Sequence, residues 1–223
     1  IMIVNMMVGN LEVPGGYYIK KTAKVLQKFP ELSGMAKGLG GLKQPEGPSP
    51  QRPRVDGAGI KGTPQQIIPA DMGAVGQLVE SIITEKPYPI KAWFVHRFNP
   101  YISMADSERV KEAFMKLDLL VTCDVYMTDT AYYSDVILPE NTYLERYEQI
   151  YDMSGAKPKY ALRQPAVPNV YPDTKPHWLI YKELGEKLGG ADFFPFNDIE
   201  DFLNQQLAAA GLTLDQMKEK GFW

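Results

Sequence analysis

The sequence has few of the residues from which several kinds of functional site are built. Its 223 residues include one cysteine and two histidines, so the chain holds no internal disulfide and no multi-cysteine or all-histidine metal site. No apolar run approaches the ~20 residues that a membrane-spanning helix needs. The 24 Lys and Arg residues are interspersed among 27 Asp and Glu residues, for a net charge of −3. That distribution excludes the clustered positive charge of a nucleic-acid-binding surface.

Glycine and proline, by contrast, are abundant and concentrated in one segment. Of the 19 Gly and 18 Pro residues, 13 lie between Gly34 and Pro64. Such a segment favours neither a helix nor a central strand, because proline removes hydrogen-bond donors and glycine has high entropy in the unfolded chain. The sequence therefore predicts three regions: an N-terminal segment over residues 1–33, a Gly/Pro-rich linker or long loop over 34–70, and a domain over 71–223.

Residues 90–139 alternate between short apolar runs and helical patterns. The runs over 90–95, 119–123 and 135–138 each end at a polar residue or a proline, which is typical of buried strands. Between the first two, apolar residues recur at helical spacing over 110–117, after a cap near Asp106. This βαβ order predicts an α/β fold with a parallel sheet flanked by helices, similar to a Rossmann domain. Further helices are predicted over 73–84, 177–188 and 198–210, and a strand over 157–164.

The carboxyl ends of the first two predicted strands are the places to look for a ligand, because ligands of open parallel sheets bind there. Asn99 is suited to contact a nucleotide's phosphate or ribose, and a plain Asn-Pro turn is the alternative. Asp124 is suited to accept hydrogen bonds from a guanine, or else to cap a short helix near 128–131. Thr128 begins that helix, where backbone N–H groups favour anions and a capping role is the alternative. No glycine-rich phosphate loop accompanies these residues, which disfavours a standard NAD or ATP site.

Few other residues suggest chemistry. Cys123 is expected to be a small buried apolar side chain, and His177 to be structural. Three glutamates near Arg146 offer acid–base carboxylates, but an exposed charged face is the favoured interpretation: Glu140, Glu145 and Glu148. No nucleophile and base stand in a recognisable arrangement, so the sequence predicts no catalytic residue and no metal ligand in this chain.

Several stretches resemble the molybdopterin oxidoreductase family, whose enzymes hold molybdenum or tungsten between two molybdopterin guanine dinucleotides. Residues 123–139 read Cys-Asp-Val-Tyr-Met-Thr-Asp-Thr-Ala-Tyr-Tyr-Ser-Asp-Val-Ile-Leu-Pro, and residues 142–146 read Thr-Tyr-Leu-Glu-Arg. Residues 8–16, Val-Gly-Asn-Leu-Glu-Val-Pro-Gly-Gly, look like the family's Gly-Asn-x₃-Pro-Gly-Gly segment. The resemblance covers nearly the whole chain. Residues 88–92 and 207–223 are most similar to the polysulfide and thiosulfate reductase branch.

The resemblance implies that the chain is an internal piece of a larger catalytic subunit. Residues 1–33 would belong to the preceding domain, and residues 71–223 would bind the guanosine end of one cofactor. Matched by position, the cofactor-binding residues are Asn99, Cys123, Asp124, Thr128, Arg146 and His177. The cysteine motif for a 4Fe-4S cluster and the side chain that binds molybdenum or tungsten would lie outside this sequence. We therefore expect the piece alone to be inactive.

The resemblance also implies a reaction, partners and a compartment. The full enzyme is expected to reduce polysulfide, thiosulfate or a related acceptor in anaerobic respiration. Its partners would be the remainder of the catalytic subunit, an iron–sulfur electron-transfer subunit and a membrane-anchor subunit, at the outer, periplasmic face of the cytoplasmic membrane. No nucleic acid and no direct membrane insertion are expected. The alternative is a degenerate domain of the same fold that binds no cofactor and serves as a structural or docking module.

Overall fold

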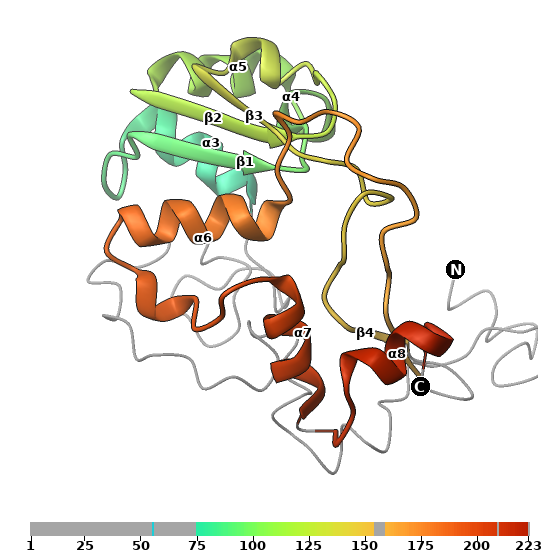
Figure 1. Cartoon of the computed structure of the whole chain (residues 1–223). Coiled ribbons are helices and arrows are strands. Elements are labelled where there is room, and N and C mark those ends of the chain that lie inside the picture. The colour runs from blue at the N-terminus through green and yellow to red at the C-terminus, as the bar shows by residue number, and fades with distance from the viewer. Residues whose placement is uncertain (1–54, 56–74, 154–158, 209, 223) are drawn as a thin grey trace, which may run out of the picture. The chain divides into compact units, whose positions relative to one another are not determined.

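The computed structural model describes residue 55 and residues 75–153, 159–208 and 210–222 (Figure 1). The predicted N-terminal segment, nearly all of the predicted linker and the start of the helix predicted over 73–84 lie outside these residues. The chain divides into two compact units. Among the described residues, the sheet unit comprises 55, 75–141 and 171–177, and the helical unit comprises 142–170 and 178–222.

The sheet unit contains three parallel strands in the order β1-β2-β3, with their arrows pointing the same way in Figure 1. This confirms the predicted α/β class. Two helices and a short helical turn separate the strands, and one helix precedes them. In chain order the elements are α3 (Val75–Thr84), β1 (Ala92–His96), α4 (Pro100–Ser103), α5 (Ser107–Lys116), β2 (Leu119–Asp124), the 3₁₀ helix η3 (Ala131–Tyr133) and β3 (Val136–Pro139).

Side-chain alternation gives the sheet two different faces. On one face, Val95 and Leu120 are buried in a core that α3 and α5 complete with Ile82, Val110 and Phe114. The register pairs His96 with Cys123 one residue further along, so those two side chains lie on the opposite face. His96, which ends β1, and Cys123, which precedes the last residue of β2, therefore do not share the face that packs against α3 and α5.

Helix α5 begins at Ser107, directly after the cap residue Asp106 that the sequence predicts. The Asp106 carboxylate accepts a hydrogen bond from the Arg109 backbone N–H at 3.2 Å, which satisfies one of the N–H groups at the helix start. Arg109 in turn donates through two nitrogens to Glu80 of α3, each at 2.8 Å. The hydrogen bond from Arg109 lowers the pKa of the Glu80 carboxyl. This solvent-exposed pair of hydrogen bonds links α5 to α3.

The segment 171–177 returns to the sheet unit after the chain has left it at Asn141. Lys175 forms a parallel bridge with Glu140: the Lys175 N–H donates to the Pro139 carbonyl at 3.2 Å, and the Asn141 N–H donates to the Lys175 carbonyl at 3.2 Å. The returning segment thus extends the sheet beyond β3 by one bridge.

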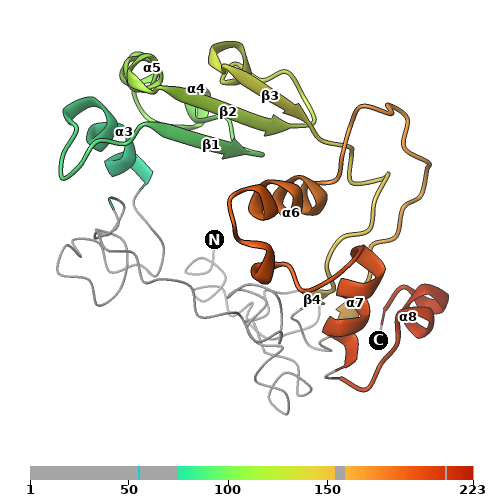
Figure 2. The ribbon, with the colours of Figure 1, turned by 60° about the vertical axis from the view of Figure 1, so that its left-hand side comes forward.

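The helical unit packs around aromatic and aliphatic side chains, among them Phe196, Phe202, Leu203 and Met217. Its elements are the antiparallel pair β4 (Tyr151–Met153) and β5 (Lys159–Ala161), then α6 (His177–Lys187, whose first residue belongs to the sheet unit), η4 (Ala191–Phe193), α7 (Ile199–Ala208) and α8 (Leu214–Lys220). Figure 2 shows the same elements after a turn of the molecule. Within the described residues, every helix is too short or too polar to cross a bilayer.

Candidate functional site

Two polar groups occupy the carboxyl edge of the sheet, and the first is built around Asn99. Its side-chain carbonyl accepts hydrogen bonds from the Thr130 hydroxyl at 2.7 Å and from the Thr130 N–H at 3.2 Å. Its amide donates to Asp129 at 3.0 Å. Asn99 therefore joins the loop after β1 to the loop after β2, which is more than the plain turn considered from the sequence.

Asp124, the last residue of β2, accepts hydrogen bonds from the described residues through one of its two carboxylate oxygens. Its Oδ1 accepts hydrogen bonds from the N–H groups of Val125 at 2.7 Å and Tyr126 at 3.3 Å. No hydrogen bond from any described residue reaches Oδ2. The Ala131 N–H, at the start of the short helix, donates instead to the Thr128 hydroxyl at 3.3 Å. The alternative in which Asp124 caps that helix is therefore wrong: the N-cap residue is Thr130, and the Thr128 hydroxyl accepts from the first helical N–H.

The second group surrounds the buried carboxylate of Glu140, whose side chain is 0% exposed. His96 Nε2 lies 3.1 Å from Glu140 Oε2, and Arg97 donates to the same oxygen through Nε at 2.9 Å and to Oε1 through a terminal nitrogen at 2.5 Å. Arg97 has a backbone φ of 50°, in the left-handed region that costs a non-glycine residue about 1–2 kcal/mol. Its ion pair with a buried carboxylate offsets that cost.

His177 completes this group from the returning segment. Its Nδ1 lies 3.0 Å from Glu140 Oε1 and 3.0 Å from an Arg97 nitrogen. Its ring stacks on that of His96, with 5.6 Å between the ring centroids. Two histidines and an arginine thus converge on one carboxylate.

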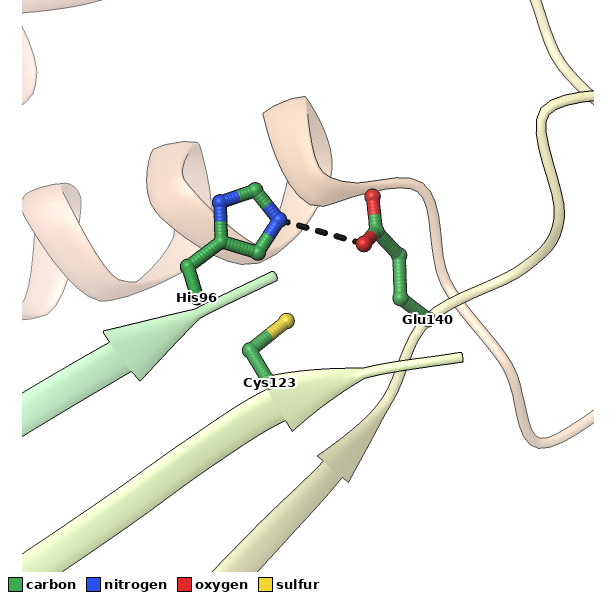
Figure 3. Close-up of side chains that lie close together, drawn as sticks. All are labelled: His96, Cys123 and Glu140. Atoms are coloured by element: carbon green, nitrogen blue, oxygen red, sulfur yellow. Dashed lines mark hydrogen bonds and ion pairs between the residues drawn. The ribbon is translucent and has the colours of Figure 1, made fainter. Parts of the chain in front are cut away.

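Strand alternation explains how Glu140 reaches the two residues on the far face of the sheet. Leu138 is in register with Cys123, and Glu140 follows Leu138 by two positions, so its side chain points to the same side. The Glu140 N–H donates to the Asp124 carbonyl at 3.0 Å, which continues the ladder past Pro139. As Figure 3 shows, His96, Cys123 and Glu140 converge, and one donor atom from each lies within 4.8 Å of the others.

Two sequence interpretations change at this point. The interpretation of Glu140 as part of an exposed charged face is wrong, because its side chain is fully buried and paired. Cys123 is buried, as expected, but it lies beside polar groups. The sequence signal for this placement was the two-residue repeat of strand side chains, which puts Leu138 and Glu140 on the same side of the sheet. It predicts the neighbours of Glu140 only when the register of β3 with β2 is known.

Arg146, the remaining predicted cofactor-binding residue, belongs to the helical unit. Its side chain is 5% exposed, and its Nε donates to Glu148 at 2.9 Å. Arg163 donates to the same Glu148 oxygen at 2.7 Å. The other five predicted residues all belong to the sheet unit, at its carboxyl edge or on the returning segment: Asn99, Cys123, Asp124, Thr128 and His177.

Parallel strands with polar loops at their carboxyl edge define an open α/β domain, the class in which ligands bind at that edge. The family model for molybdopterin oxidoreductase matches residues 1–187, and the chain belongs to that family. The chain is 39% identical to the thiosulfate reductase molybdopterin-containing subunit PhsA of Salmonella typhimurium, over 100% of this chain and 29% of that protein. It is 32% identical to the F420-dependent formate dehydrogenase subunit alpha of Methanocaldococcus jannaschii, over 66% of this chain and 22% of that protein.

A solved structure shows the same fold. Acetylene hydratase from Pelobacter acetylenicus is similar with a TM-score of 0.62 and 27% identity, covering 69% of this chain and 21% of that one. The chain thus spans about a fifth to three tenths of the length of these relatives. Membership of the family implies a molybdopterin cofactor with molybdenum or tungsten. The names of the relatives refer to thiosulfate, formate and acetylene, so the family alone does not select a substrate.

Proposed function

We propose that the sheet unit binds the guanosine end of a molybdopterin guanine dinucleotide, as part of the catalytic subunit of a molybdenum or tungsten oxidoreductase. The observation that supports this most directly is Asp124 at the carboxyl end of the central strand. Its Oδ1 is held by two backbone N–H groups, which fixes the carboxylate, while Oδ2 accepts nothing from the described residues. A fixed, partly exposed carboxylate oxygen at this edge is suited to accept a hydrogen bond from a nucleoside.

The geometry fits one hydrogen bond from the guanosine better than two. Accepting hydrogen bonds from both the ring N–H and the amino group of guanine requires both carboxylate oxygens. Oδ1 already accepts from two backbone N–H groups. We therefore propose that Oδ2 accepts from a guanine N–H or a ribose hydroxyl. Two positions further along the chain, Tyr126 is 77% exposed, and its ring offers a surface on which a base can stack.

The other predicted residues take different parts in this proposal. Asn99, through Thr130 and Asp129, holds the loops after β1 and β2 together, and Thr128 shapes the second loop, so both position the nucleotide site. Arg146 offers a guanidinium for phosphate or ribose, with Glu148 fixing its orientation. By their position in the sequence, Cys123 and His177 are further candidates for contact with the cofactor, although relatives often have Asp where this chain has His177. In this chain both lie in or beside the Glu140 group, which gives them a second role considered below.

For the whole enzyme, we propose reduction of thiosulfate or polysulfide in anaerobic respiration. The 39% identity to a thiosulfate reductase subunit over the full chain supports this choice. The proposal includes two guanine dinucleotides around the metal, a 4Fe-4S cluster bound by residues outside this chain, iron–sulfur and membrane-anchor subunits as partners, and a periplasmic location. The cofactor would supply the oxidation–reduction chemistry, and this chain's residues would bind and orient its nucleotide end.

The nucleotide assignment is tested with Asp124→Asn, which keeps the Oδ1 acceptor and replaces Oδ2 with a donor. Loss of one hydrogen bond to a charged acceptor is worth about 1.5–3 kcal/mol, so GDP affinity should fall at least tenfold. Isothermal titration of the 223-residue chain with GDP and ADP measures both this loss and the preference for guanine. Asp118→Asn, at the opposite end of β2, is the matched control and should leave GDP affinity unchanged.

Three outcomes contradict the assignment. Equal affinity for GDP and ADP would remove recognition of guanine from the proposal. An Asp124→Asn chain that binds GDP as tightly as the wild type would remove Asp124 from the site. If the wild-type chain binds neither nucleotide, and the full-length protein also lacks pterin and metal by elemental and cofactor analysis, the domain is a docking module instead.

A further inference from the structure

We infer that His96, Cys123 and Glu140 form a binding site for a divalent metal ion of the zinc type. Cys123 lies near the end of the central strand β2, His96 ends the neighbouring strand β1, and Glu140 directly follows β3 on the other side. Their donor atoms, an imidazole nitrogen, a thiol sulfur and a carboxylate oxygen, all lie within 4.8 Å of one another (Figure 3). The sequence predicts no metal ligand here, because the three residues are at least 17 positions apart and only the sheet register brings them together.

The spacing suits a tetrahedral ion with little adjustment. Zinc bonds of about 2.0–2.3 Å require neighbouring donor atoms to be roughly 3.3–3.8 Å apart. The His96 nitrogen and a Glu140 oxygen are 3.1 Å apart, and the widest separation in the group is within 4.8 Å. Side-chain rotations that change these distances by about 1 Å therefore reach the required geometry.

The donor set selects the kind of ion. Imidazole and thiolate are ligands for borderline and soft ions such as Zn²⁺, whereas Mg²⁺ and Ca²⁺ prefer oxygen atoms alone. Binding would replace the thiol proton of Cys123 with the metal and release that proton to solvent, and the proton that His96 Nε2 donates to Glu140 would move to Nδ1, which leaves the Nε2 lone pair for the ion. Thiolate and carboxylate together supply two negative charges, and the Arg97 guanidinium that pairs with Glu140 supplies one positive charge, so the occupied site would carry a net charge of +1.

Surrounding residues hold the carboxylate in the way metal sites require. Arg97 donates to both oxygens of Glu140, and His177 Nδ1 lies 3.0 Å from Oε1, so the oxygen nearest His96, Oε2, keeps its direction toward that ring. Partners of this kind orient a ligating carboxylate, and their loss commonly lowers metal affinity 10–100-fold. A salt bridge between Arg97 and Glu140 alone requires neither a thiol nor a histidine at this position.

The test uses the full 223-residue chain, treated with a chelator and titrated with Co²⁺ and then Zn²⁺. We expect one Co²⁺ per chain, an intense near-ultraviolet band from a cobalt–thiolate bond, and loss of that band when Zn²⁺ displaces the cobalt. Since Cys123 is the only cysteine, Cys123→Ser should abolish the band and weaken Zn²⁺ binding at least tenfold. His96→Gln should also weaken Zn²⁺ binding at least tenfold.

Glu148→Gln is the matched control, because it removes a largely buried carboxylate that is held by two arginines in the helical unit. It should bind Co²⁺ and Zn²⁺ like the wild type. Circular dichroism of each variant separates loss of a ligand from loss of the fold, and Cys123→Ala offers a second substitution if serine disturbs the sheet. Binding of Co²⁺ without a thiolate band, unchanged Zn²⁺ affinity in folded Cys123→Ser, or a wild-type chain that binds neither ion would each overturn the inference.

Discussion

A glutamate in each unit is paired with arginine, and the two glutamates differ in their burial and in their other partners. The Glu140 side chain in the sheet unit is 0% exposed and that of Glu148 in the helical unit is 14% exposed. Glu140 meets Arg97, His96 and His177. Glu148 meets the two arginines Arg146 and Arg163.

The difference shows that the side chains around a carboxylate determine whether the group can also bind a metal ion. Removing a carboxylate from water is costly in either unit, and an arginine compensates for it in both. Arginine has no lone pair to offer a metal and keeps its charge at any ordinary pH, so the Glu148 group is suited to anchoring alone. Histidine and cysteine retain lone pairs, so the Glu140 group keeps the capacity to bind an ion.

The largest expected effects come from the two cores and test whether the units are independent. Leu120→Ala in the sheet unit and Leu203→Ala in the helical unit each leave a cavity in place of a fully buried side chain and should cost about 3 kcal/mol. Hydrogen exchange read by mass spectrometry should show faster exchange in β1–β3 for the first and in α7 and α8 for the second. Equal acceleration in both units for either variant would mean that the chain unfolds as one cooperative body.

A smaller effect is expected from the glutamates themselves. Glu140→Gln keeps the shape of the side chain but removes the charge that faces Arg97, and should destabilise the sheet unit by about 2 kcal/mol. Glu148→Gln should cost about 1 kcal/mol in the helical unit, because the Arg163 side chain is 47% exposed and water screens the pair. The same exchange measurement, with peptides over β3 and over 159–163, reads each effect separately.

Glu112→Gln is the control for this pair, since it breaks an exposed contact with Arg109 on α5 and should change protection little. A Glu148→Gln chain that loses more protection than Glu140→Gln would reverse the comparison between the two groups.

The smallest effect is a dependence on pH near Glu145. Hydrogen bonds from the backbone N–H of Val170, at 2.7 Å, and from Thr142, at 2.6 Å, lower the pKa of the Glu145 carboxyl. A carboxyl whose pKa is lower in the folded chain stabilises that chain above the unfolded value of about 4.3, and the stabilisation disappears as pH falls through the folded value. As pH falls through the pKa of Glu145 in the folded chain, hydrogen exchange around residues 142–146 and 166–170 should therefore accelerate. Glu145→Gln should remove this dependence on pH. An unchanged profile in the variant would assign the pH effect to another group.

Much of the sheet unit could be predicted from local sequence. Strand β2 follows from an apolar run that ends at Asp124, and α5 follows from its apolar spacing after Asp106, because both signals lie within a few residues. The burial of Glu140 could not be predicted in this way, since it depends on the register of β3 with β2 and on a segment more than 30 residues later. The pairing of Arg146 with Glu148 and Arg163 likewise depends on contacts across the chain.

The bridge between Glu140 and Lys175 has a topological consequence. The chain leaves the sheet unit at Asn141 and rejoins it at Tyr171, and backbone hydrogen bonds join residues 139–141 to Lys175, so residues 142–170 are inserted between two segments that pair with each other in the sheet unit. Insertions with adjacent ends cost the host domain little entropy when their length changes. Residues 142–170 also carry β4, β5 and the Arg146–Glu148–Arg163 group, so a change in their length would alter the helical unit, whereas a single cut within them would leave the segment 171–177 attached to the sheet by its own hydrogen bonds.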